Sequence, residues 1–356
     1  MTSEASPVMS DIQEIPASND GQPDYFCVCR WGTGENIFDF PISQIQDVLQ
    51  DQEATLWLDI HDPDGKYSSQ VERLFRDVFQ FHPLSIEDAL QESNHPKLDD
   101  WDRYLYTVFH AIDFDPDTDE LRLHELDAFL GRNYLVTYHT EPLSVVDKVR
   151  QVIQRDSENR LKRRPDHVLY LLMDRGVDEH LAAIEHLDEA IETLMDLILE
   201  KPSFELMGRI YQIKRSVARV YRIIVPQREV ANRLARDQYA QVGTRDRIYF
   251  RDVYDGLVRL HGLVEGNRDL VSGAIETYLS ISANRTNDVM KTLTIVTVLF
   301  LPLNFLAGFF GMNFFADNIA IDSWAPGKIL LFVLTCACML GSASAFWWWG
   351  RKRGWY

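Results

Sequence analysis

The stretch Thr292–Ala316, with the sequence TLTIVTVLFLPLNFLAGFFGMNFFA, is the longest part of the chain that carries no charged side chain. About 20 consecutive apolar residues in a helix cross the hydrocarbon core of a bilayer, which is about 30 Å thick. The stretch therefore predicts a membrane-spanning helix. Small and weakly polar residues recur in it at steps of three and four, which places them on one face of that helix. Such a stripe within lipid faces other helices or water.

A second charge-free run, Ile329–Trp349, follows after a short segment that holds two aspartates and one lysine. Three tryptophans end this run as an interfacial aromatic belt does, and Arg351–Arg353 follow at once. By the positive-inside rule the C-terminus is cytoplasmic and the short segment lies outside. Two crossings then place the large N-terminal part in the cytoplasm of a cell whose plasma membrane the chain spans.

The weakly polar stripe of the first span has two interpretations. It lines a pore, or it allows helices to pack closely through small residues. Two spans cannot enclose a pore, so the first interpretation requires a ring of identical subunits; a packed monomeric or dimeric anchor is the alternative. Three apolar members of the stripe would form a constriction that gates by dewetting, or else belong to an ordinary core. The predicted pore-lining residues are Asn287, Met290, Leu293, Thr294, Thr297, Leu301, Asn304 and Gly308.

The composition restricts the class of protein. The formal net charge of −18 and the pI of about 4.9 argue against nucleic-acid binding, which needs clustered Lys and Arg. The same charge could gather cations. The four cysteines lack the spacing of a zinc or redox site, so we expect free thiols in a reducing compartment. The polar first residues show no signal peptide and predict a disordered tail.

Periodicity predicts an α/β domain followed by long helices. We expect strands at 25–31, 37–40, 55–60, 104–114, 121–130 and 134–139, and helices at 42–49, 68–79, 82–90, 143–155, 167–199, 204–236 and 249–310. Ser68 or Ser69 would cap the second of these helices. The last helix, about 90 Å long, would leave the soluble body and enter the membrane without interruption.

These patterns divide the chain into consecutive segments. They are a disordered tail (1–24), a cytosolic α/β domain (25–142), a cytosolic helical hairpin region (143–248), a stalk helix that continues into the first span (249–311), an outer loop (312–328), the second span (329–349) and a basic cytoplasmic C-terminus (350–356).

The chain resembles the CorA family of magnesium transporters over nearly all of its length after residue 24. The triplet Gly311-Met312-Asn313 at the outer end of the first span is the signature of that family. Further resemblance lies in SANRTNDVMKTLTIVTVLFLPLNFLAGFFGMNF, HPLSIEDAL, HPKLDDWDRYLYTVFH, RRPDHVLYLLMDRGVDEH, IKRSVARVYRIIVPQREV, YFRDVYDGLVRL and the terminal RKRGWY. The resemblance implies a funnel-shaped homopentamer that transports Mg²⁺, often with Co²⁺ or Ni²⁺ as accepted ions. Mg²⁺ would be both the transported and the regulatory ligand, with no organic cofactor.

The chain departs from the usual family pattern around the triplet. Phe310 stands where Tyr is common, Asn304 stands where Thr is common, and the segment 314–317 lacks the frequent Glu and Met-Pro. These departures bear on the ion preference and on the charge of the outer mouth.

The triplet suits a selectivity filter for a hydrated ion. Mg²⁺ gives up its water reluctantly and demands octahedral geometry. A ring of Asn313 amides could hydrogen-bond to the waters of the ion, whereas carboxylates there would hold the ion too tightly for rapid release. The alternative is that Gly311, Met312 and Asn313 simply end the helix.

The resemblance also implies regulatory metal binding between adjacent subunits in the cytosol. The acids that match the family motifs are Asp88 and Asp252, with Glu87, Asp174 and Asp255 as plausible neighbours. Carboxylates brought together across an interface repel, so bound Mg²⁺ would close the ring and an empty site would loosen it. Each acid could instead take part in a surface salt bridge, for instance Asp252 with Arg251.

Two other functions compete with the Mg²⁺ channel. A Zn²⁺ transporter of the ZntB type, with or without proton coupling, would have the same architecture, but Met312 favours magnesium because those relatives usually carry another residue there. A membrane-anchored enzyme is disfavoured, because the chain has no Gly-rich phosphate loop, nucleophile elbow or HExxH motif. We therefore expect a transporter and not an enzyme.

Overall fold

The structure is a computed structural model, and it describes residues 23–32, 34–91, 95–115, 120–155, 164–201, 203–310 and 326–352. The chain separates into two compact units, residues 1–275 and 276–356. The expected disordered tail, the outer loop and the filter triplet lie outside the described residues, apart from the last residues of the tail and the first of the second helix.

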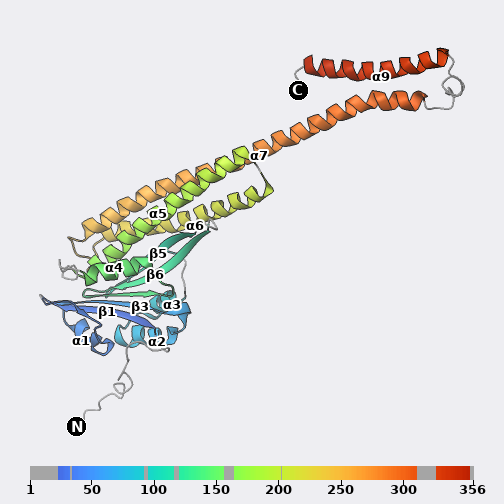
Figure 1. The fold of residues 1–356 in the computed structure, drawn as a ribbon. Helices are drawn as coiled ribbons and strands as arrows, with labels where there is room; N and C mark the ends of the chain where they lie inside the picture. The colour runs from blue at the N-terminus through green and yellow to red at the C-terminus, as the bar shows by residue number, and fades with distance from the viewer. Residues whose placement is uncertain are drawn as a thin grey trace, which may run out of the picture. The chain divides into compact units, whose positions relative to one another are not determined.

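The first unit is built on a seven-stranded sheet with the order β2-β1-β3-β7-β6-β5-β4 (Figure 1). Neighbouring strands pair antiparallel except β3 and β7, which pair parallel in the middle of the sheet. The strands are β1 (Asp24–Trp31), β2 (Ile37–Phe38), β3 (Ala54–His61), β4 (Lys97–Asp100), β5 (Leu105–Asp115), β6 (Glu120–Leu130) and β7 (Tyr134–His139).

Helices cover both faces of this sheet, which is why its central strands are buried throughout. On β3, Leu56 and Leu58 belong to the core that the small helices complete, whereas Asp59 faces α4 and bonds Arg150. Alternate side chains of a strand point to opposite faces, so both sets must find partners. One face carries α1 (Ile45–Gln50), α2 (Ser68–Arg73), the π-helical turn η3 (Leu74–Val78) and α3 (Pro83–Leu90); the other carries α4 (Ser144–Gln154), α5 (Pro165–Glu200) and α6 (Phe204–Arg236).

The long helices approach the sheet and one another closely at two glycines. A Cβ on Gly176 of α5 would lie 2.2 Å from Cζ of Phe109 on β5. A Cβ on Gly256 would lie 2.9 Å from Cγ1 of Val177 on α5. Gly256 belongs to α7 (Arg247–Phe310), a single helix of 64 residues. α5 is therefore held between β5 and the first part of α7.

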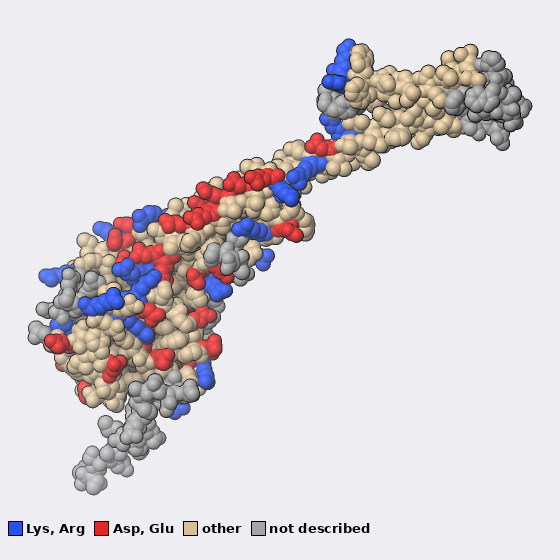
Figure 2. All heavy atoms as spheres, in the orientation of Figure 1, with Lys and Arg blue, Asp and Glu red and all other residues tan. Residues whose placement is uncertain are grey.

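The second unit contains the C-terminal part of α7 and α9 (Pro326–Lys352). Within the described residues, α7 is the one helix long and apolar enough to cross a membrane, with a mean hydropathy of 1.9 over its most apolar window and none of that window buried. Figure 2 shows an almost uncharged surface over this part of the chain, and acidic side chains gathered over the helices that precede it. At the end of α9, Arg351 and Lys352 lie over the rings of Trp347 and Trp348.

The structure confirms most of the predicted elements and corrects three details. Strand β4 was not predicted, because its sequence KLDD holds a single apolar residue. The helix expected at 68–79 stops at Arg73 and continues as the π-helical turn. The expected serine cap is wrong: Tyr67 is the N-cap residue, and the Ser68 hydroxyl donates instead to the carbonyl of Gly65 at 2.6 Å.

Candidate ion pathway and cytosolic acidic site

All eight predicted pore-lining residues lie on α7 and are exposed in the single chain. Met290 is 56%, Leu293 58% and Leu301 65% exposed, values that are unusual for large apolar side chains in water. The hydroxyls of Thr294 and Thr297 donate to the carbonyls of Met290 and Leu293, at 2.8 and 2.9 Å. A hydroxyl oxygen that donates its hydrogen in this way can still accept hydrogen bonds.

The second unit distinguishes two faces of α7. Half-buried residues of α7 recur at steps of three and four: Ile295, Val298, Leu299, Pro302, Leu303 and Leu306. α9 has a matching half-buried face made of Thr335, Cys336, Met339, Ser342, Ala343 and Phe346. The two helices lie side by side (Figure 1), so these half-buried faces are the ones that they turn toward each other. Because successive residues turn by about 100° around a helix, the predicted stripe lies nearly opposite the face of α7 that α9 covers.

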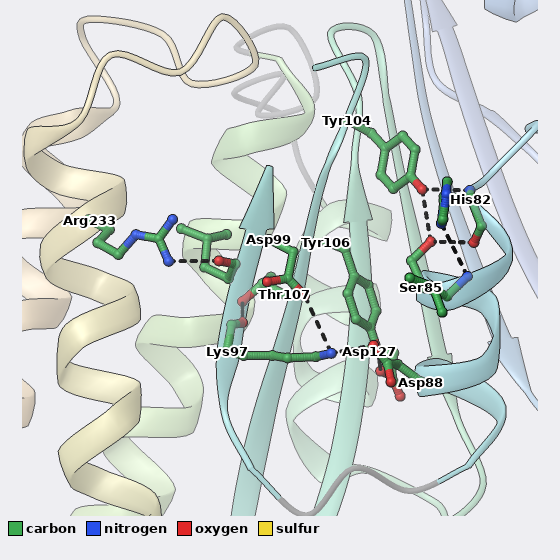
Figure 3. A network of polar contacts seen from close by, with 12 residues as sticks. His82, Ser85, Asp88, Lys97, Asp99, Tyr104, Tyr106, Thr107, Asp127 and Arg233 are labelled. Carbon is green, nitrogen blue, oxygen red and sulfur yellow. Dashed lines mark hydrogen bonds and ion pairs between the residues drawn. The ribbon is translucent and has the colours of Figure 1, made fainter. Parts of the chain in front are cut away.

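The cytosolic acid Asp88 is on α3, whose N-terminal end is fixed to the sheet. The backbone N–H of His82 donates to the phenol oxygen of Tyr104 at 2.8 Å, and the Ser85 hydroxyl lies 2.8 Å from the same atom. The Nδ1 atom of His82 accepts from the N–H of Leu84 and caps the helix. At the other end of α3, the half-exposed Asp88 carboxylate forms an ion pair with Lys97 of β4 (Figure 3).

Asp174 and Asp252 form a second acidic group, made by α5 and α7. Asp174 is half-buried, and burial first, then the charges of Asp178 and Asp252, raise the pKa of its carboxyl, although Arg175 opposes them. Burial raises the pKa of the neighbouring Tyr170 to about 12, with further contributions from Asp174 and Asp252. The repulsion that Asp178 and Asp252 exert on the Asp174 carboxylate would be relieved by a bound cation.

The alternative salt bridge of Asp252 with Arg251 does not form within the described part of the chain. Asp252, Asp255 and Glu87 are exposed there and make no ion pair. Asp88 does take part in such a salt bridge, which it forms with Lys97.

The structure brings Asp174 and Asp252 together but keeps Asp88 apart from them. α3 lies on one face of the sheet, and α5, which carries Asp174, lies on the other. Among the described residues, no three metal-binding side chains of one chain form a cluster that could hold an ion. Oxygen ligands are the ones that Mg²⁺ prefers, so the carboxylates have suitable chemistry, but a site that joins Asp88 to Asp252 requires a second copy of the chain.

Sequence reasoning missed Lys97, the residue that contacts Asp88. Its position becomes clear only from β4, a strand that the hydrophobic pattern does not reveal. The available signal was the sequence HPKLDD, in which one lysine stands close to several acids.

Comparison with known proteins agrees with this architecture. The profile of the family described as CorA-like Mg²⁺ transporter protein matches residues 52–352. The chain is 34% identical to the cobalt/magnesium transport protein CorA of Thermotoga maritima over 282 residues, which cover 79% of this chain and 80% of that protein. It is also 26% identical over 191 residues to the zinc transport protein ZntB of Photorhabdus laumondii, covering 53% of this chain and 56% of that protein.

A solved structure shares the whole fold. The complete CorA magnesium transporter of Methanocaldococcus jannaschii superimposes with a TM-score of 0.75 at 20% identity, covering 93% of this chain and 98% of that one. The chain belongs to the CorA-like family of divalent metal ion transporters, which are membrane proteins.

Proposed function

We propose that the chain forms a homopentameric channel that carries Mg²⁺ across the plasma membrane down its electrochemical gradient. The first span of each copy supplies the pore lining, and the triplet Gly311-Met312-Asn313 supplies the selectivity filter. Co²⁺ and Ni²⁺ are further permeant ions. The N- and C-termini lie in the cytoplasm.

The observation that carries this proposal is the division of α7 into two faces. α9 covers the side opposite the weakly polar stripe, which leaves the stripe free to meet the same stripe of other copies. Hydroxyl and amide oxygens on such a stripe can accept hydrogen bonds from the waters of a hydrated ion without holding the ion tightly.

The cytosolic acids supply the regulation in this proposal. Asp88 of one copy and Asp252 of the next bind Mg²⁺ together, with Glu87, Asp174 and Asp255 close by. An ion that binds the closed ring better than the open one shifts the equilibrium by its difference in affinity alone. The raised pKa of Asp174 supports the expectation that Arg175 only partly compensates the charge of this acidic group.

Ion uptake by purified protein in vesicles tests the transport proposal. We expect entry of Mg²⁺ and Co²⁺ that follows the ion gradient and the membrane potential and needs no proton gradient. Uptake of Zn²⁺ that depends on a proton gradient, with little Mg²⁺ entry, would favour the ZntB type of transport instead.

Limited proteolysis tests the regulatory proposal. Millimolar Mg²⁺ should protect the parent protein, whereas Asp88→Ala combined with Asp252→Ala should still transport Mg²⁺ but lose this protection. Equal protection of both proteins would show that these acids are surface charges.

A further inference from the structure

The carboxylate of Asp88 already has a cation from its own chain. The ammonium group of Lys97 forms an ion pair with Oδ2 of Asp88 and lies 3.3 Å from Oδ2 of Asp99 (Figure 3). It also lies 5.1 Å from the centre of the Tyr106 ring. One side chain therefore joins α3, β4 and β5 at the carboxylate to which we assign metal binding.

Lys97 is held in this place by its backbone. It stands opposite Val108 in the antiparallel pairing of β4 with β5. Its carbonyl accepts a hydrogen bond from the Thr107 hydroxyl at 2.9 Å, and the next carbonyl, that of Leu98, accepts one from Arg233 of α6 at 2.7 Å. β4 is thus fixed from the sheet and from a helix, so the side chain of Lys97 starts from a fixed point.

Asp88 starts from an equally fixed point through different contacts. Tyr104 anchors the N-terminal turn of α3, and Ile86 and Ala89 are buried in the core. Both charged side chains remain accessible, however, with 29% of Lys97 and 41% of Asp88 exposed. A hydrated ion can therefore reach the carboxylate, provided that it displaces the ammonium group.

The surroundings leave Lys97 a second partner after such a displacement. Its contacts with Asp99 and with the Tyr106 ring do not involve Asp88. Asp127 lies near this group and accepts the phenol hydrogen of Tyr106 at 2.5 Å. Burial and the charge of Glu125 raise the pKa of Asp127 well above its ordinary value and favour its neutral form, although Lys97 opposes this shift.

We propose that Lys97 is a built-in competitor of Mg²⁺ for Asp88, so that metal binding at the cytosolic site is an exchange of one cation for another. This inference rests on the proposed regulatory role of Asp88. A Mg²⁺ ion on the Asp88 carboxylate would lie within a few ångströms of the ammonium group, and the repulsion between the two cations disfavours binding of both at once. Because Mg²⁺ must displace the ammonium group, the ring closes at a higher Mg²⁺ concentration than it would without Lys97. The second partner, Asp99, makes it easier for the ammonium group to leave Asp88.

The test measures the Mg²⁺ concentration that gives half-maximal protection of the full-length protein from protease. Lys97→Met keeps the methylene chain over Tyr106 but removes the charge. We expect the midpoint to fall by about three- to fivefold, the range that a partly exposed ion pair of up to about 1 kcal/mol allows. In an Asp88→Asn background, Lys97→Met should change nothing further.

Two other variants separate the contact from general charge effects. Arg76→Gln removes an exposed, ion-paired cation of η3 that has no contact with Asp88, and should leave the midpoint within experimental error of the parent. Asp99→Asn removes the second partner of Lys97, so the ammonium group should stay on Asp88 and the midpoint should rise. Asp99→Asn also serves if Lys97→Met does not fold, since its own side chain is partly exposed.

Two results would overturn the inference, and they differ from one another. If Asp88→Asn abolishes protection but neither Lys97→Met nor Asp99→Asn moves the midpoint, the exchange is wrong and the regulatory site stands. If the parent and Asp88→Asn show the same response to Mg²⁺, the assignment of Asp88 fails and the exchange fails with it.

Discussion

The two units of the chain differ in how far their large apolar side chains are exposed to solvent. In the first unit, side chains as large as Trp57, Phe75 and Phe129 are wholly buried. In the second, Leu301 and Phe305 are 65% and 69% exposed. A single copy therefore completes the core of the first unit, whereas the exposed apolar surface of the second unit suits the hydrocarbon of a bilayer. In the proposed pentamer, further copies would cover the rest of that surface.

The sharpest test of this comparison concerns the filter. Asn313→Ala should abolish Mg²⁺ uptake, because it removes the amide dipoles of the proposed ring. Expression and oligomer size should stay as in the parent, since no core volume is lost. The measurement is ion uptake into vesicles together with the elution volume in detergent. Uptake close to that of the parent would show that Asn313 only ends the helix.

The assembly itself can be measured directly. If the second unit requires other copies, the protein extracted in detergent should have the mass of five chains in native mass spectrometry. A stable monomer that still conducts ions would break the comparison, because the second unit would then be complete in one chain.

Acid should affect the first unit through His180. Its Nε2–H donates to the carbonyl of His110 at 2.7 Å, and Nδ1 is buried without a hydrogen-bond partner. Burial, which favours the neutral ring, lowers its pKa to about 4 from 6.5. The stability that this neutral ring contributes is complete above about pH 6.5 and is lost as the pH falls through 4, a change of about 3 kcal/mol.

The variant His180→Gln keeps a donor but does not titrate. The free energy of unfolding of the first unit, measured by urea titration between pH 7 and pH 4, should fall less steeply in this variant than in the parent. The helices of the second unit should keep their circular dichroism over the same range in detergent, since Thr292–Ala316 contains no titratable group. Identical pH profiles for parent and variant would contradict the assignment to His180.

Substitution of one glycine in each unit tests the same comparison through a smaller change in stability. Gly176→Ala places a methyl group 2.2 Å from the Phe109 ring, and should destabilise the first unit by about 1–3 kcal/mol through overpacking. Gly308→Ala meets no atom within 4 Å in the single chain. It should leave the urea midpoint of the first unit unchanged. Equal loss of stability from both substitutions would mean that the second unit is packed as tightly as the first.

The fold was predictable wherever one physical signal dominated. Alternation of apolar residues placed the long strands β5, β6 and β7, and the continuous helical pattern after Tyr249 predicted α7 to its last described residue, Phe310. Strand β4 was not predicted, because it is held by its pairing with β5 and by the hydrogen bond from Arg233 to the carbonyl of Leu98. Neither contact is visible in a local sequence pattern.

The candidate site was predictable only in part. The stripe on α7 follows from helical spacing, and the structure adds that α9 covers the other side. The choice of Asp88 and Asp252 came from resemblance and stays a prediction. The lysine and acids of HPKLDD gave only a weak signal for the pairing of Asp88 with Lys97, because this pairing depends on how α3 is oriented by Tyr104, and that is a tertiary contact.

The parallel pairing of β3 with β7 divides the folding of the sheet into local and distant steps. β4 to β7 follow one another as a meander, and β1 pairs with both β2 and β3, which are close to it along the chain, so each half can form from local contacts. Joining the halves closes a long loop, and such contacts are slow to form. Asp59 of β3 meets its donors Thr137 and Arg150 only in that step, since both belong to later parts of the chain. The Asp59 carboxylate is wholly buried in the finished sheet, so joining the two halves must also remove this charge from water, which adds a desolvation cost to a step that forms slowly.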